Sequence, residues 1–141
     1  MSEHSLAIEN IRHLARLRKL RKELDECDRS FKAFVRLAWS HVEPQELQWG
    51  WHMDAICEHL EALTRREIRN LIINIPPRSS KSTLVSVLFP AWRWMSRLSP
   101  DDYAIEGCPD GPEERFLSIS YGQKLATRDA RKCRNLIRSD W

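Results

Sequence analysis

The segment from Leu71 to Thr83 constrains this chain most, because an apolar run leads into a short loop of prolines and serines that ends in Lys-Ser-Thr. An apolar stretch with the pattern of a helix follows it. This is the layout of a phosphate-binding loop. In the usual G-x-x-x-x-G-K-[ST] pattern, backbone N–H groups surround the phosphates, the lysine reaches the β and γ phosphates, and the next hydroxyl holds Mg²⁺. Lys81 and Ser82 occupy the last two positions of that pattern.

Both glycines of the pattern are absent, since Ile75 and Ser80 stand in their places. Glycine is favoured there because it reaches positive φ and lets the backbone approach the ligand closely. A small Ser79-Ser80 pair is the next least obstructive choice, and the two prolines after Ile75 end the expected strand. The alternative interpretation is a strand, a proline turn and a helix whose Lys81 is merely solvated.

The sequence around the loop carries a wider pattern. It comprises residues 43–74, the loop from Pro76 to Ser82, the strand end at Ser120-Tyr121, and the helix from Arg128-Asp129 to Leu136-Ile137. Together these segments closely resemble the large terminase subunit of tailed phages, over roughly residues 34–141. Such proteins are DNA-packaging motors with an N-terminal ATPase domain and a C-terminal nuclease domain. The family commonly has an arginine-containing loop that ends in Lys-[ST], which agrees with the missing glycines.

The resemblance implies that ATP and Mg²⁺ are the cofactors, and phosphoryl transfer of this kind depends mainly on positioning and charge neutralisation. Lys81 is expected to neutralise the β and γ oxygens, Ser82 to ligate Mg²⁺, and Thr83 to donate to the α phosphate. Arg78 matches the family's loop arginine and is expected to contact the γ phosphate. Ser79 and Ser80 complete the cofactor-binding loop.

The segment before the third helix lies against the adenine in this family. Gln48 and the ring of Trp49 are therefore the candidates for contact with the base, through an amide edge or through stacking. The alternative interpretation is that Trp49 and Trp51 are core aromatic residues.

The predicted fold class is α/β, an incomplete P-loop NTPase domain with a parallel sheet, preceded by N-terminal helices. Residues 1–42 form the predicted helical segment, and residues 43–141 form the N-terminal part of the ATPase domain, with an insertion at about 97–115. The periodicity predicts two strands and five helices. The strands are 71–75 and 116–121, and the helices are 5–26, 30–41, 49–64, 82–95 and 124–138.

Two parts of the resembled motor are absent from this sequence. There is no apolar strand ending in Asp-Glu, which would complete the Mg²⁺ site and orient water, and there is no nuclease domain. In the family that strand lies between the two strands predicted here, so these two are not expected to be neighbours. The intact protein is expected to be an ATPase, and the 141-residue chain alone is expected to be inactive.

Charge and cysteine content limit the remaining possibilities. The formal charge of +3 is small, but basic residues crowd the first and last predicted helices, and acids crowd residues 101–114. The four cysteines form no C-x-x-C pair, so neither a disulfide framework nor a zinc site is indicated. The sequence shows no signal peptide and no apolar stretch that approaches the roughly 20 residues needed to span a bilayer. The cytoplasm of the bacterial host is the predicted location, with no membrane partner.

By resemblance, the partners are double-stranded DNA, the small terminase subunit and the portal or prohead, with a homo-oligomer in the motor. Two other functions stay open at this point. One is another P-loop nucleic-acid motor such as a helicase. The other is a non-enzymatic truncated remnant that acts as a binding module.

Overall fold

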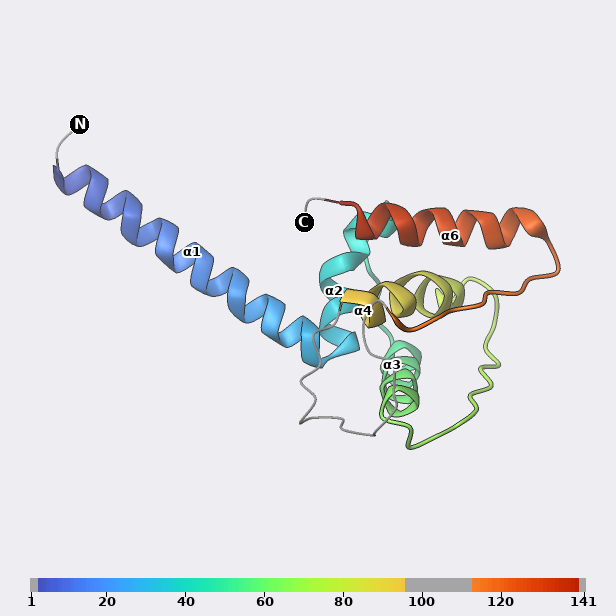
Figure 1. Cartoon of the computed structure of the whole chain (residues 1–141). Coiled ribbons are helices and arrows are strands. Elements are labelled where there is room, and N and C mark those ends of the chain that lie inside the picture. Colours follow the sequence, from blue (N-terminus) through green and yellow to red (C-terminus); the bar gives the residue numbers. More distant parts are fainter. Residues whose placement is uncertain (1–2, 96–112, 140–141) are drawn as a thin grey trace.

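The computed structural model describes residues 3–95 and 113–139, and the regular elements in these ranges are helical (Figure 1). The chain begins with the long helix α1 (Glu3–Arg29), followed by α2 (Phe31–Val42) and α3 (Trp51–Thr64). A π-helical segment η1 (Thr83–Leu88) continues directly into α4 (Phe89–Met95), and α6 (Gln123–Ile137) follows. All five predicted helices are therefore present, within a few residues of their expected bounds.

The predicted parallel sheet is wrong for the described part of the chain. Residues 71–75 and 116–121 are extended, but they form no β-ladder, and no backbone–backbone hydrogen bond joins them to any other described residue. A groove of about 450 Å³ is lined by both segments, including Ile73 and Phe116. A strand needs a second strand beside it, whereas a helix completes its hydrogen bonds within itself. With no third extended segment in this groove, the described residues make no sheet.

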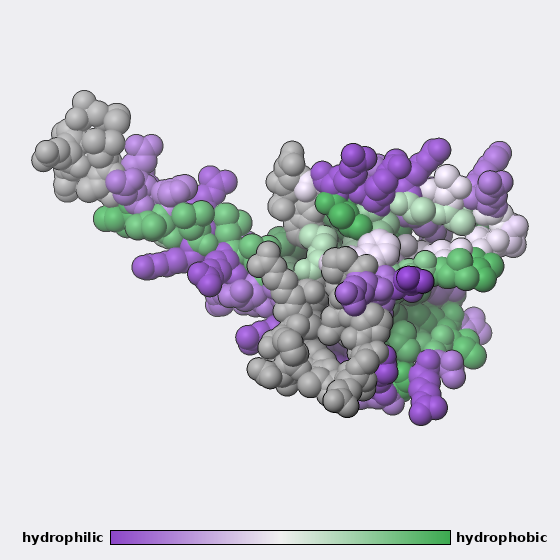
Figure 2. All heavy atoms as spheres, viewed as in Figure 1, coloured by the Kyte–Doolittle hydropathy of each residue, from purple (hydrophilic) through white to green (hydrophobic). Residues whose placement is uncertain are grey.

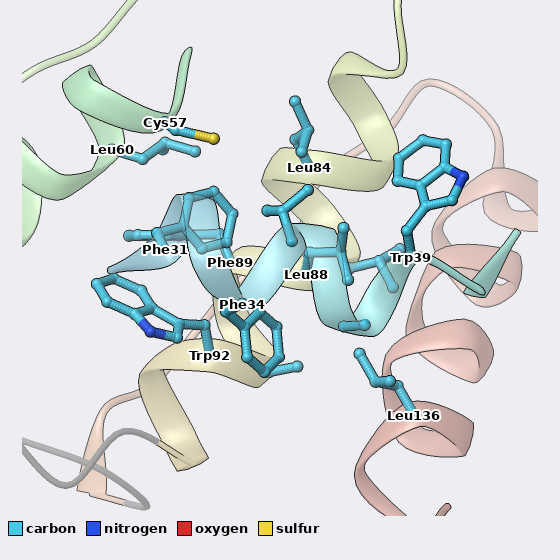
Figure 3. Close-up of a cluster of buried hydrophobic side chains, with 14 of the residues drawn as sticks. Phe31, Phe34, Trp39, Cys57, Leu60, Leu84, Leu88, Phe89, Trp92 and Leu136 are labelled. Carbon is cyan, nitrogen blue, oxygen red and sulfur yellow. The ribbon is translucent and has the colours of Figure 1, made fainter. Parts of the chain in front are cut away.

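The core is built around α2, which packs against α3, η1, α4 and α6. Figure 3 shows Phe31 facing Phe89 and Trp92, with ring centroids 5.6 and 5.3 Å apart. Leu84, Leu88 and Leu136 are buried in the same cluster. Burial of apolar surface contributes roughly 25 cal/mol per Å², so this cluster supplies most of the driving force for folding. It also fixes where the 76–82 loop enters the helix that follows it.

Helix α2 has Ser30 as its N-cap. The Ser30 hydroxyl accepts a hydrogen bond from the Ala33 N–H at 3.4 Å. A second cap comes from α3, where Glu61 Oε1 accepts from the Phe31 N–H at 2.7 Å and from the Lys32 N–H at 3.4 Å. These bonds satisfy N–H groups of the first helical turn, which have no acceptor within the helix. The negative carboxylate also interacts favourably with the positive end of the helix dipole.

Helix α1 projects away from the core, and only its C-terminal end is packed (Figure 1). Cys27 is buried, and its carbonyl accepts a hydrogen bond from the Trp92 indole at 2.8 Å. Earlier apolar residues such as Ile11 and Leu24 are exposed, and Figure 2 shows the resulting apolar band along the helix. No helix within the described ranges is long and apolar enough to cross a membrane.

Arg93 and Trp94 in α4 hold Glu114, which lies at the C-terminal end of the predicted insertion. The Arg93 guanidinium is 2% exposed and its Nε donates to Glu114 Oε2 at 2.6 Å, while the Trp94 indole donates to the Glu114 carbonyl at 2.7 Å. The insertion itself, predicted at 97–115, lies outside the described residues except for 113–115.

Candidate anion-binding loop

The backbone of the 76–82 loop is held in an uncommon conformation. Arg78 and Ser80 have φ values of 68° and 59°, in the left-handed region that non-glycine residues rarely occupy. Such strain persists only where the surroundings enforce it, and it clusters at functional sites. Ser80 therefore adopts the positive φ that glycine supplies at its position in the usual pattern. A bend of this kind can turn neighbouring N–H groups toward one point, as in anion-binding nests.

A helix starts directly after this bend, at Lys81. The first helical hydrogen bond runs from the Leu84 N–H to the Ser80 carbonyl at 3.0 Å. The N–H groups of Lys81, Ser82 and Thr83 precede it and have no helical acceptor. Because these groups carry partial positive charge at the start of a helix that continues to Met95, an anion is favoured here.

The helix widens into a π-helix immediately after the loop. In η1 the Phe89 N–H donates to the Leu84 carbonyl, five residues back. π-Helical turns are rare and often occur at functional sites. The sequence predicts an ordinary helix over 82–95, because its apolar spacing gives no sign of the wider turn.

The side chains of the loop differ in their exposure to solvent and in whether they are already hydrogen-bonded. Arg78 and Ser82 are exposed and Lys81 is half-buried, so all three have contact with solvent. The Ser79 hydroxyl donates to the Pro76 carbonyl, which closes the loop on itself. The loop thus presents the Ser82 hydroxyl and the cations of Arg78 and Lys81 beside the start of the helix.

Thr83 is already engaged by a carboxylate. Its hydroxyl donates to Glu43 Oε1 at 2.8 Å, and the Lys132 ammonium of α6 donates to the same oxygen at 2.6 Å. Burial alone would raise the pKa of Glu43, but the hydrogen bonds from Lys132 and Thr83 outweigh it and lower the pKa. No sequence pattern gives Glu43 a role, because its partners lie 40 and 89 residues away along the chain.

The two candidates for adenine contact lie in different environments. Gln48 is exposed. The ring of Trp49 is half-buried against the core, with the Arg36 guanidinium 4.6 Å and the Lys32 ammonium 5.5 Å from its centroid. Both cations are close enough to the ring for cation–π attraction. Trp51, by contrast, is 82% exposed and does not belong to the core.

Helix α6 adds a basic surface next to this region. Cys133 and Leu136 face the core, and the outer side carries hydrophilic residues, as Figure 2 shows. A groove of about 470 Å³ is lined by Gln123, Lys124, Thr127, Arg128, Arg131, Lys132 and Asn135. Since Lys132 also holds Glu43, this groove and the loop are connected through one carboxylate.

No group of three or more His, Cys, Asp or Glu side chains in residues 3–95 and 113–139 is arranged to hold a metal ion. His59, which shares a helix face with His52, instead places its Nδ1 2.7 Å from the Ala55 carbonyl. The Ser82 hydroxyl, the predicted Mg²⁺ ligand, is exposed.

Comparisons of the chain with protein-family models, with curated protein sequences and with solved structures each gave no match.

Proposed function

We propose that this chain binds the phosphates of ATP through its 76–82 loop, as the nucleotide-binding part of a terminase-like large subunit. One observation carries the proposal, namely the left-handed backbone at Arg78 and Ser80 directly before a helix that starts at Lys81. A left-handed backbone costs free energy in residues other than glycine, and such conformations cluster at functional sites. A phosphate bound by the N–H groups of this bend would account for it. The proposal concerns the loop and its helix and does not require a parallel sheet.

The side chains of the loop suit a triphosphate with Mg²⁺. Lys81 supplies a point charge for the β and γ oxygens, and the planar guanidinium of Arg78 suits the terminal phosphate. Ser82 supplies an oxygen ligand for Mg²⁺. By resemblance, the intact protein would hydrolyse ATP to move double-stranded DNA into a prohead in the bacterial cytoplasm, with the small terminase subunit and further copies of itself.

A second candidate function is a nucleic-acid-binding module without catalysis, and the basic groove on α6 favours it. Lys124, Arg128 and Arg131 recur on one side of the helix, where they can neutralise successive backbone phosphates. Binding of this kind would not depend on Lys81. It would weaken steeply as salt is raised.

Calorimetric titration of Mg-ATP into the 141-residue chain tests the proposal. Lys81→Ala should weaken binding by about ten- to a hundredfold, because a hydrogen bond to a charged group contributes about 1.5–3 kcal/mol. The matched control is Lys22→Ala, which removes the same charge from the exposed surface of α1 and should leave the affinity unchanged. Equal ATP affinity of the parent and Lys81→Ala would refute the proposal. If the chain then binds DNA in a salt-sensitive manner, the second candidate function is favoured.

A further inference from the structure

Glu43 lies at the junction of three helical elements. It follows the last residue of α2, where its backbone N–H donates to the Trp39 carbonyl at 2.9 Å. Its carboxylate accepts from Thr83, at the start of η1, and from Lys132, in the middle of α6. The Glu43 side chain is 22% exposed and that of Lys132 is 32% exposed, so both groups lie at the edge of solvent.

Both donors are of kinds that bind phosphate oxygens equally well. A hydroxyl in the first turn of a helix and a lysine ammonium are common partners of phosphate groups. Thr83 lies two residues after Lys81, in the same helical turn, and Arg128 adds further attraction for negative charge at Glu43. The carboxylate therefore occupies donors that a phosphate beside Lys81 would also use.

We propose that Glu43 is an internal competitor of the bound phosphate, a carboxylate that holds Thr83 and Lys132 until a phosphate oxygen replaces it. This inference rests on the proposed function of the loop. Binding then exchanges one anion for another at both Thr83 and Lys132. Glu43 thereby sets the affinity of the loop and couples the loop to α6.

The competing explanation is a purely structural one, in which Glu43 only joins α2, η1 and α6. The two explanations predict opposite signs for Glu43→Gln, which preserves shape and hydrogen-bonding capacity but removes the charge. A neutral amide is a weaker competitor for the two donors, because charge-assisted hydrogen bonds are roughly twice as strong as neutral ones. A structural role predicts instead a less stable protein whose phosphate affinity is unchanged or lower.

The test is calorimetric titration of the full chain with inorganic pyrophosphate. Glu43→Gln should bind it about five- to tenfold more tightly than the parent, at the lower end of typical coupling between sites. The matched control is Glu46→Gln, which removes an exposed carboxylate three residues away and should change affinity less than about twofold. Lys132→Gln should weaken binding.

Unchanged or weaker pyrophosphate binding by Glu43→Gln would overturn the inference while leaving the loop assignment in place. If Lys81→Ala bound pyrophosphate as tightly as the parent, or if the parent did not bind it, the inference and the proposed function of the loop would be overturned together. Circular dichroism establishes that each variant is folded. A measurement on the parent needs no substitution: the ¹³C carboxyl signal of Glu43 should shift on titration with pyrophosphate, and a fixed signal would contradict the exchange.

Discussion

The helical core and the two extended segments contain similarly apolar residues but bury them very differently. In the core, Phe31, Leu84 and Leu88 are each 0% exposed. In the extended segments, Ile72 is 93% exposed and Leu117 is 86% exposed. A helix with one apolar face needs only one packing surface, and α2 supplies it for several neighbours. An extended segment in a parallel sheet needs neighbouring strands beside it and cover on both faces.

The extended segments are covered incompletely. Leu71, Ile73 and Ile75 pack against the core and alternate with exposed residues, whereas in the segment 116–121 only Phe116 packs against it. Alternation of this kind is the normal pattern of a strand with one buried side. The difference between the two regions is thus one of available partners and not of residue type.

The first prediction contrasts one leucine from each region and carries the largest expected effect. Leu88→Ala removes a side chain that is 0% exposed and should cost about 2–5 kcal/mol in free energy of unfolding, from lost transfer energy and a cavity. Leu117→Ala, at 86% exposed, should change it by less than about 0.5 kcal/mol. Chemical denaturation of both variants measures the difference, and similar losses would show that the extended segment is as well packed as the core.

The second prediction concerns the carboxylate that joins α3 to the start of α2. Glu61→Gln should cost about 1 kcal/mol, because the N–H groups of Phe31 and Lys32 exchange a charged acceptor for a neutral one. The matched control is Glu58→Gln, an exposed residue on the same helix, which should have little effect. If the midpoints of thermal unfolding fall equally, the cap is not what stabilises this end of the core.

The third and smallest effect concerns pH. The pKa of Glu43 is lowered below its ordinary 4.5, since hydrogen bonds from Lys132 and Thr83 outweigh the raising effect of burial. A lowered folded-state pKa stabilises the fold above pH 4.5, and this contribution is lost as the pH falls through the folded-state value. Glu43→Gln should therefore lose less stability on acidification than the parent does. Parallel unfolding curves at several pH values compare the two, and identical acid profiles would contradict the lowered pKa.

Sequence reasoning succeeded where structure is decided locally. The helices α2, α3 and α6 are each specified by apolar residues a few positions apart along the chain, so periodicity predicted them. The sheet prediction failed because the pattern of Leu71–Ile75 reports a tendency to be extended and apolar, whereas a sheet also needs a neighbour at the right distance. Similarly, the spacing of Lys81 and Ser82 is a local pattern that predicts a phosphate site, whereas the contacts of Glu43 depend on residues that only the folded chain brings beside it.

The contacts between α4 and Glu114 bear on how far the length of the segment between them can vary. Arg93 and Trp94 fix one end of the segment that starts after Met95, and Glu114 fixes the other. Closing a longer loop between two fixed ends costs little, about 0.6 kcal/mol for each doubling of its length. Breaking the ion pair of a buried arginine costs far more, about 3–5 kcal/mol. A change in the number of residues between these two points should therefore cost far less stability than loss of the guanidinium or its carboxylate.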